Sequence, residues 1–363
     1  GYYNCTFNTS SMPARWYDIS FEAARAYYHD GNTTFDDRFF IETKPVLTVA
    51  KVNTSTYDND DGPVGGYSET FNFSVRVTDE DGDTVIAYLY IRKWNSTAND
   101  WGPWKLEGYV SCINCNNTLL YRTKSNFYCE DIGEWQFKWN ATDDGDAPLS
   151  GGTSYRDETL PKNFTVEKDD IEIQYYAGSG GWIWRNGTAS EVLSVKVWDV
   201  DDQRYLATGE ANGMIWITTD GSTWDAGHGV GVLGGFFNYS FDPTCAYSIG
   251  LQYWKAGTKD NTCFKDVNSS LFNITLRTYL IGDVEKPSGE PYKRGEIVPF
   301  SFYIRDECGY GVTGIDRTLY LNTEGASYVI TSGIDDLGNG TYTYGWDSTN
   351  KALGWYNVTF EAS

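Results

Sequence analysis

The stretch FNFSVRVTDEDGDTVIAYLYI, residues 71–91, decides the fold class. Its two ends, FNFSVRV and IAYLYI, carry aromatic or β-branched residues at alternating positions, which is the period-two pattern of strands that bury one face. Similar segments recur at Trp135, Leu193, Phe272 and Val298, and Gly, Asp, Asn and Pro turns separate them. The pattern is typical of sandwiches and predicts an all-β chain of tandem Ig-like β-sandwich domains, with a partial domain at the N-terminus.

Three breaks divide the chain into units of ordinary sandwich size. They fall in FIETKPVL near Pro45, in TVEKDDIEI near Lys168 and in LIGDVEKPSGEP near Lys286. The expected units are the C-terminal half of an Ig-like domain with its connector at 1–42, and complete Ig-like domains at 43–168, 169–282 and 283–363.

Residues 1–24 repeat residues 340–363 at one register without a gap. RWYDISFEA near the start matches GWYNVTFEA near the end, which pairs Trp16 with Trp355. The match predicts that residues 1–24 form the closing hairpin of an Ig-like domain, equivalent to the last hairpin of the chain. Half a sandwich leaves an apolar face uncovered, so this hairpin is expected to pack on polypeptide upstream or on a neighbouring subunit.

Asn-x-Ser/Thr triplets are dense, with fifteen among 24 asparagines. This density predicts N-glycosylation on exposed loops and strands, and hence an extracellular protein at the cell surface. Asn72 is expected to point outward from its strand, and Asn140 to lie accessible at a strand end. The predicted acceptors are Asn4, Asn8, Asn32, Asn53, Asn72, Asn95, Asn116, Asn140, Asn163, Asn186, Asn238, Asn268, Asn273, Asn339 and Asn357.

Seven cysteines indicate disulfides formed in oxidising surroundings. Cys245 and Cys263 flank a short aromatic stretch and are expected to form a local bridge. Cys129 is expected to pair with Cys112 or Cys115. The spacing of Cys112 and Cys115 also occurs in redox and zinc sites, but the following NCNNTLLY offers neither a helix nor further ligands.

Two cysteines lack an expected mate in their own unit. The repeat places Tyr344 opposite Cys5, so the final domain has no counterpart of this cysteine. Cys308 stands alone in its domain. We therefore predict that Cys5 and Cys308 bond to material outside the chain, such as another copy of it.

The net charge of −22, from 50 acidic and 28 basic residues, limits the partners. A nucleic acid needs clustered Lys and Arg, so none is expected. No apolar run is long enough to cross a bilayer, so this segment is not expected to insert into a membrane directly. Copies of so acidic a chain repel one another unless cations bridge them, and self-association into a polymer or lattice is the partner interaction that we expect.

Two acidic turns are candidates for metal binding. TDEDGDT and TDDGDAP each follow a core strand of the same unit and place carboxylates around a glycine. Such turns can surround Ca²⁺ with oxygen ligands, although an ordinary solvated turn has the same composition. No cofactor is required by this interpretation. The candidate ligands are Asp79, Asp81, Asp83, Asp143, Asp144 and Asp146.

Several of these segments resemble a known family. The segment at residues 69–91, with GEWQFKWNATDDGDA and the closing NFTVEKDD, is similar to an Ig-like module of archaeal surface proteins, especially the S-layer and sheath-type glycoproteins of methanogens. GTYTYGWDSTNKALGWYNVTFEA is similar to the last hairpin of related modules, although Ala352 stands near a turn where proline is expected. The resemblance is weakest from Asp169 to Thr278. It implies a role in the cell envelope and no catalytic residues.

The sequence favours a structural role over catalysis. The two histidines, His29 and His228, fall in separate units and are expected in exposed loops, and no hydrolase or P-loop motif occurs. We therefore expect a non-catalytic structural repeat of an extracellular glycoprotein assembly, whether S-layer, sheath or surface filament, stabilised by disulfides and glycans. The alternative is a carbohydrate-binding or adhesin module whose sugars stack on exposed aromatic rings, with candidates Trp101, Trp104, Trp182 and Trp184.

Overall fold

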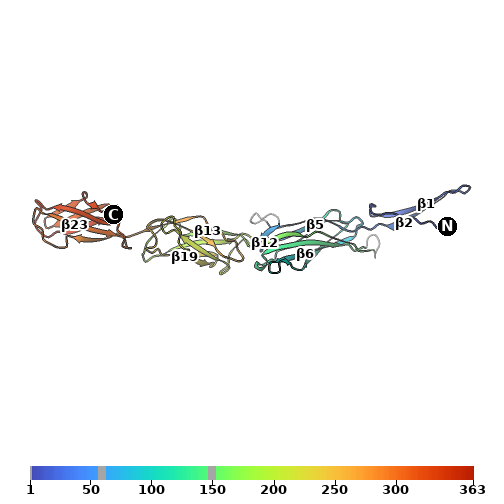
Figure 1. Ribbon diagram of the computed structural model, residues 1–363, viewed down its shortest axis with the longest axis horizontal. Helices are drawn as coiled ribbons and strands as arrows, with labels where there is room; N and C mark the ends of the chain where they lie inside the picture. Colours follow the sequence, from blue (N-terminus) through green and yellow to red (C-terminus); the bar gives the residue numbers. More distant parts are fainter. Residues whose placement is uncertain (1, 56–62, 146–152) are drawn as a thin grey trace. The chain divides into compact units, whose positions relative to one another are not determined.

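The computed structural model describes residues 2–55, 63–145 and 153–363, and these residues are almost entirely strands and loops (Figure 1). One short 3-10 helix, Cys129–Asp131, interrupts the strands. No helix in the described ranges is long and apolar enough to cross a membrane. The all-β fold class predicted from alternating residues is confirmed.

The chain divides into two compact units, which are described separately. Unit 1 comprises Gly1–Glu172, Trp198–Tyr205 and Asp260–Asp266, and unit 2 comprises Ile173–Val197, Leu206–Lys259 and Val267–Ser363. The strand pairings group into four successive stretches of sequence: β1–β2, β3–β12, β13–β21 and β22–β28. The last stretch begins at Ile281, slightly before the expected start of its domain.

The stretch β3–β12 forms a β-sandwich in unit 1. One sheet has the order β3-β5-β9, and the second has the order β4-β12-β10-β6-β7, with β8 added to β6 and β11 added to β10. The strands are β3 (Val46–Asn53), β4 (Val64–Gly66), β5 (Phe71–Thr78), β6 (Thr84–Asn95), β7 (Asp100–Trp101), β8 (Lys105–Ile113), β9 (Thr118–Lys124), β10 (Gly133–Thr142), β11 (Arg156–Glu158) and β12 (Lys162–Glu167).

The alternation in the quoted stretch produces the core of this sandwich. Phe71 and Phe73 on β5 are fully buried, and Asn72 between them is exposed. Phe164 of the second sheet packs with its ring 5.5 Å from that of Phe71 and 5.2 Å from that of Phe73. Burying large aromatic side chains contributes about 1.5–3 kcal/mol each. The outward orientation predicted for Asn72 is therefore correct, and the same period sets the register of both sheets.

The stretch β13–β21 contributes two further sheets. The first contains β13 (Ile171–Ala177), β15 (Glu191–Asp199), β16 (Arg204–Tyr205) and β19 (Phe236–Phe241). In the second, β14 pairs in parallel with β21 and the other neighbours are antiparallel. Its strands are β14 (Trp182–Trp184), β17 (Asn212–Ile217), β18 (His228–Gly231), β20 (Gly250–Thr258) and β21 (Phe272–Arg277).

The stretch β22–β28 forms a sandwich in unit 2. Its two sheets have the orders β22-β23-β27-β26 and β25-β24-β28. Phe302, Leu319 and Tyr342 are fully buried between them. The strands are β22 (Ile281–Lys286), β23 (Ile297–Arg305), β24 (Arg317–Thr323), β25 (Ala326–Ile330), β26 (Asp335–Asp336), β27 (Thr341–Asp347) and β28 (Asn357–Ala362).

The predicted hairpin at the N-terminus is wrong. β1 (Trp16–Ala23) pairs with β2 (Gly31–Phe40), and residues 2–9 form no strand. At the other end of the chain, β27 and β28 belong to different sheets, so the two repeated segments do not pair with each other there either. Tyr342 on β27 is buried because β23 and the opposite sheet cover it, whereas Tyr3, its counterpart, is 85% exposed. The sequence repeat reproduces one strand, because β1 matches β28.

Candidate metal centre

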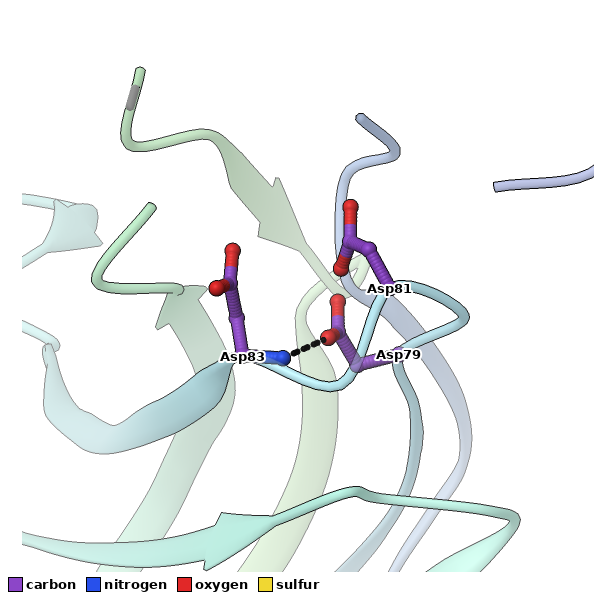
Figure 2. Close-up of side chains that lie close together, drawn as sticks. All are labelled: Asp79, Asp81 and Asp83. Carbon is purple, nitrogen blue, oxygen red and sulfur yellow. Dashed lines mark hydrogen bonds between the residues drawn. The ribbon is translucent and has the colours of Figure 1, made fainter. Parts of the chain in front are cut away.

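The two acidic turns predicted to bind metal meet at one end of the unit 1 sandwich. Asp79, Asp81 and Asp83 lie in the turn between β5 and β6, as Figure 2 shows. β10 runs antiparallel to β6, with Thr142 opposite Ile86, so that Asp143 follows β10 beside the start of β6. The carboxylates therefore come from two loops that the sheet brings together.

Backbone hydrogen bonds shape the first turn around Asp79. Its Oδ2 accepts the amides of Gly82 and Asp83 at 3.1 and 2.8 Å. Gly82 has φ +90°, a conformation that glycine adopts without a steric penalty. Asp81 accepts hydrogen bonds through its Oδ2 from the amide and the hydroxyl of Thr43, in the connector that precedes β3.

The remaining carboxylate oxygens converge. Asp79, Asp81 and Asp83 each offer an oxygen, and these oxygens lie within 4.8 Å of one another. In the described part of the chain, three buried oxygens here accept no hydrogen bond: Oδ1 of Asp79, Oδ1 of Asp81 and Oδ2 of Asp143. A buried carboxylate oxygen without a partner is costly unless a cation or a proton supplies one.

Burial and neighbouring negative charges raise the pKa values of two carboxyl groups in this site. Burial raises the pKa of Asp79 to about 7, and the neighbouring carboxylate of Asp81 contributes to the rise. Burial also raises the pKa of Asp143, to which the charges of Asp83 and Asp81 contribute. A hard cation with oxygen ligands fits this donor set, since Ca²⁺ takes six to eight oxygens from carboxylates, carbonyls and water.

The other predicted ligands lie apart from this group or outside the described residues. Asp144 is exposed and accepts the amide of Thr84 at 3.1 Å through its Oδ1. Asp146 falls outside the residues that the structure describes. The structure thus brings Asp79, Asp81, Asp83 and Asp143 together, and their metal binding stays a prediction.

The raised pKa of Asp79 gives a testable pH dependence in chelator. Its folded-state pKa of about 7 lies above the unfolded value of about 4, so the folded protein holds this proton more tightly. The resulting stability is complete below about pH 4 and is lost as the pH rises through about 7. We therefore expect the melting temperature of the wild type to decline relative to that of Asp79→Asn across this interval.

Calorimetry at several pH values, with EDTA and with Ca²⁺, measures this difference. Saturating Ca²⁺ should abolish the decline, because the ion replaces the proton as the partner of the carboxylate. A wild type that gains stability over Asp79→Asn between pH 4 and 7 in EDTA would contradict the assignment.

A second acidic group, which the sequence did not predict, also lies in unit 1. Asp169, Asp199 and Asp201 place carboxylate oxygens within 4.8 Å of one another, and all three side chains are buried. Thirty residues separate Asp169 from Asp199, and only the pairing of the strands brings them together. An Asp near the end of an apolar strand is a weak sequence signal. It could draw attention to each of these residues separately, but it does not predict that they lie close together.

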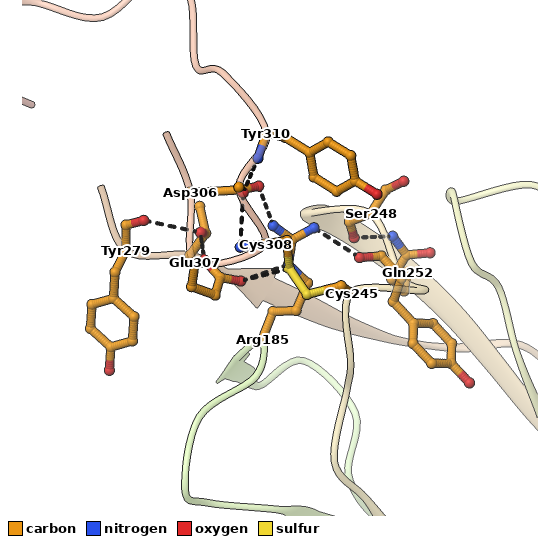
Figure 3. A network of polar contacts seen from close by, with 12 residues as sticks. Arg185, Cys245, Ser248, Gln252, Tyr279, Asp306, Glu307, Cys308 and Tyr310 are labelled. Atoms are coloured by element: carbon orange, nitrogen blue, oxygen red, sulfur yellow. Dashed lines mark hydrogen bonds and ion pairs between the residues drawn. A yellow bond between two sulfur atoms is a disulfide. The ribbon is translucent and has the colours of Figure 1, made fainter. Parts of the chain in front are cut away.

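The disulfides differ from the predicted pairs. Cys245 bonds to Cys308 rather than to Cys263, as Figure 3 shows, and Cys129 bonds to Cys263 rather than to Cys112 or Cys115. Cys112 and Cys115 form a bridge of their own. The prediction failed because nearness in sequence is a poor guide when strands from distant segments are neighbours. Cys308 therefore has a mate within the chain, whereas Cys5 carries an exposed free thiol.

A buried ion-pair network adjoins the disulfide in unit 2. Arg185, just after β14, pairs through Nε with Glu307 at 2.7 Å and through Nη2 with Asp306 (Figure 3). Its Nη1 also donates to the carbonyl of Tyr247 at 3.0 Å. Arg185 thereby fixes the loop that carries Cys308 against the strands of the preceding stretch.

The histidines were only partly predicted. His29 is exposed in a loop, as expected. His228 begins β18 and is half-buried, with its ring stacked on Tyr239 at 4.1 Å and its Nε2 3.0 Å from Asp225. Tyr247 donates to the same carboxylate at 2.8 Å, so that His228 belongs to a packed polar cluster.

The aromatic rings proposed as sugar platforms contact other side chains, although Trp182 remains 49% exposed. Trp184 stacks on Tyr279 at 4.2 Å, and Arg277 lies over Trp182 at 4.5 Å. Arg92 lies 4.3 Å from the Trp104 ring. Trp101 packs edge-on against Trp94. These contacts use the rings for packing inside their own units.

Comparisons with known proteins give no family. No family model and no curated protein match the chain. Solved structures that it resembles include a tetra-tandem repeat in the extending region of a large adhesion protein, with 11% identity, a TM-score of 0.38 and coverage of 97% of this chain and 82% of that chain. A structure of a 1.5-MDa bacterial ice-binding adhesin has 11% identity and a TM-score of 0.30, and the match covers 89% of this chain and 98% of that chain. A red sea bream transglutaminase has 13% identity and a TM-score of 0.28, and the match covers 65% of this chain and 31% of that chain. All three TM-scores are below 0.5, so these likenesses carry no argument.

Proposed function

We propose that this chain is a non-catalytic structural repeat module of an extracellular glycoprotein assembly, such as an S-layer, a sheath or a surface filament. The observation that carries the proposal is the pairing of six of the seven cysteines in three disulfides on tandem sandwiches. Such bridges persist outside the reducing cytosol and restrain unfolding where no chaperone acts.

The positions of the sequons support an extracellular site. Every predicted acceptor is exposed except Asn140, which is half-buried within β10. Asn140 lies opposite Tyr88 and Glu158 on the neighbouring strands, and this differs from the accessible strand end expected for it. Glycans on the exposed asparagines would shield strand edges from proteases and from unwanted pairing.

Self-association is part of this proposal. The exposed thiol of Cys5 lies between Tyr3 and Phe7, which are 85% and 63% exposed. An unpaired cysteine within an uncovered aromatic segment suits a covalent link to another copy or to other polypeptide. Ca²⁺ at Asp79, Asp81 and Asp83 would strengthen the turn that contacts Thr43, in the connector that precedes β3.

Peptide mapping of the protein from its natural source, without reduction, tests the proposal. We expect the bridges Cys112–Cys115, Cys129–Cys263 and Cys245–Cys308, together with glycans on most sequons and the least on Asn140. Because an acceptor must be accessible, Asn140 serves as the internal control. Free thiols at the six cysteines of these bridges, together with asparagines that carry no glycan, would refute the extracellular role.

A pocket in unit 2 favours carbohydrate binding as a second candidate function. It has a volume of about 400 Å³ and is lined by Tyr292, Trp346, Trp355 and Tyr356 among other residues. Trp355 is 84% exposed and offers a free platform for a sugar ring. A glycan array with the wild type and Trp355→Ala separates the two functions. Binding of a defined sugar that the variant loses favours the module, and silence of both favours the structural role.

A further inference from the structure

Asp169, Asp199 and Asp201 form a buried carboxylate cluster, which we call the junction cluster. The three residues are 0%, 0% and 4% exposed, and their oxygens lie within 4.8 Å of one another. All three belong to unit 1, and the chain passes from unit 1 to unit 2 shortly after Asp169, at Glu172. Three negative charges are thus buried where the chain leaves one unit for the other.

The backbone fixes the cluster from several sides. The amide of Asp169 donates to the carbonyl of Cys263 at 3.0 Å, and the amide of Lys265 donates back to the carbonyl of Asp169 at 3.0 Å. The disulfide from Cys263 to Cys129 anchors this bridge. These backbone bonds and the disulfide hold Asp169 in place, although neighbouring carboxylates repel one another.

A second set of bonds fixes the turn after β15. The amide of Val200 donates to the carbonyl of Asp170 at 2.9 Å. Asp201 Oδ2 accepts the amide of Asp170 at 2.7 Å, and Asp199 Oδ1 accepts the amide of Asp202 at 3.1 Å. Each carboxylate is thus oriented by a backbone amide through one of its oxygens.

One carboxylate oxygen of Asp169 has no hydrogen-bond partner among the residues that the structure describes. Asp169 Oδ1 accepts the amide of Ser68 at 3.3 Å, but Asp169 Oδ2 accepts no hydrogen bond from the described residues, although the side chain is wholly buried. Arg204 lies nearby, with its Nη2 3.7 Å from Oδ2 of Asp199 and its Nε 2.9 Å from Oδ2 of Asp202.

Gly66, at the end of β4, leaves room for these carboxylates. A Cβ atom at this position would lie 2.5 Å from Asp169 Oδ1 and 2.5 Å from Asp201 Oδ2, which is closer than real contacts allow. The absence of a side chain at Gly66 therefore lets the carboxylates of Asp169 and Asp201 lie against the backbone of β4.

We propose that Asp169, Asp199 and Asp201 bind a Ca²⁺ ion, with Asp169 Oδ2 as one of the ligands. A divalent cation supplies the partner that this buried oxygen lacks. Ca²⁺ suits the site better than Mg²⁺, which keeps several waters in its shell and dehydrates reluctantly. The inference does not depend on the proposed function. Burial raises the pKa of Asp169 to about 7 and that of Asp199 to about 6, in agreement with a site that holds either protons or a cation.

The bound ion would join two segments of unit 1 that are distant in sequence. These are the exit from β12, which carries Asp169, and the end of β15 with the turn that follows it, which carry Asp199 and Asp201. Ca²⁺ would thereby raise the free energy of local opening of the segments next to Glu172, because it binds only when these segments are folded.

Titration of the full chain with Ca²⁺ tests the proposal. The background is the variant Asp79→Asn/Asp81→Asn, which disables the other candidate centre, after treatment with EDTA and its removal. We expect one equivalent of Ca²⁺ to bind and to raise the melting temperature by several degrees. Adding Asp169→Asn should weaken binding at least about tenfold, whereas adding Asp266→Asn, an exposed control in the same unit, should leave it unchanged.

The melting temperature in EDTA distinguishes a lost ligand from a misfolded variant. Asp169→Asn keeps the shape of the side chain and removes a repelled charge, so it should be at least as stable as its background without Ca²⁺ and should gain nothing from Ca²⁺. Terbium bound in place of Ca²⁺ gives a second readout through Tyr67. Burial raises the pKa of Tyr67, and the charges of the nearby Asp169 and Asp199 raise it further, which places this ring close to the cluster. Binding of equal strength with and without Asp169→Asn would overturn the proposal, as would no binding in the background.

Discussion

Replacing Cys129 and Cys263 together by alanine is expected to lower the free energy of unfolding of unit 1 by about 5 kcal/mol. The bridge joins residues 134 apart in sequence, so its loss restores a large amount of freedom to the unfolded chain. Cys263 also carries the carbonyl that accepts the amide of Asp169, so the exit from β12 should open first. Denaturant unfolding followed by limited proteolysis measures the loss and shows where cleavage begins.

The bridge between Cys245 and Cys308 provides the matched control. It closes a separation of 63 residues and lies wholly in unit 2, so its removal should destabilise unit 2 and leave the unfolding of unit 1 unchanged. If both double variants change the same transition, or if neither changes any, the assignment of the bridges to separate units is wrong.

Arg185→Met is expected to destabilise unit 2 by about 3–5 kcal/mol. The side chain of Arg185 is 4% exposed and those of Asp306 and Glu307 are 7% and 12% exposed, so the substitution leaves two buried carboxylates without their cation. The free energy of unfolding from a denaturant titration measures the effect. Methionine keeps much of the volume of the arginine, and the loss therefore reports the charge.

Arg305→Met is the matched control, because it removes an arginine of the same unit from an exposed pair. Its Nε lies 3.2 Å from Asp283, with side chains 35% and 55% exposed, and such pairs contribute at most about 1 kcal/mol. Equal losses from the two substitutions would show that the network around Arg185 does not act as a buried ion pair.

The strands could be predicted from sequence because their signal is local. Phe71 and Phe73 alternate with Asn72, and that alternation alone places the core on one face and a predicted glycan acceptor on the other. The acidic turn at Asp79 was visible for the same reason, since its candidate ligands lie within five residues. Asp143 could be added because its turn follows a core strand of the same unit, although only the register of β10 against β6 places it next to Asp83.

The features that failed depend on contacts between distant segments. Cys129 and Cys263 become neighbours only because Phe264 bridges to Asp169 beyond β12, and no spacing rule contains that information. Asp169 and Asp199 meet because β13, which follows Asp169, is the neighbour of β15, which ends at Asp199. The repeat at Trp16 misled in another way, because identical residues pair differently when the strand that covers them differs.

Imaging of the native cell surface with an antibody against this chain tests the central claim most directly. The account predicts label over a continuous layer, sheath or filament outside the cell, and loosening of this structure by a thiol that reduces the bridges. Label inside the cell, or on single molecules with no extended assembly, would contradict it.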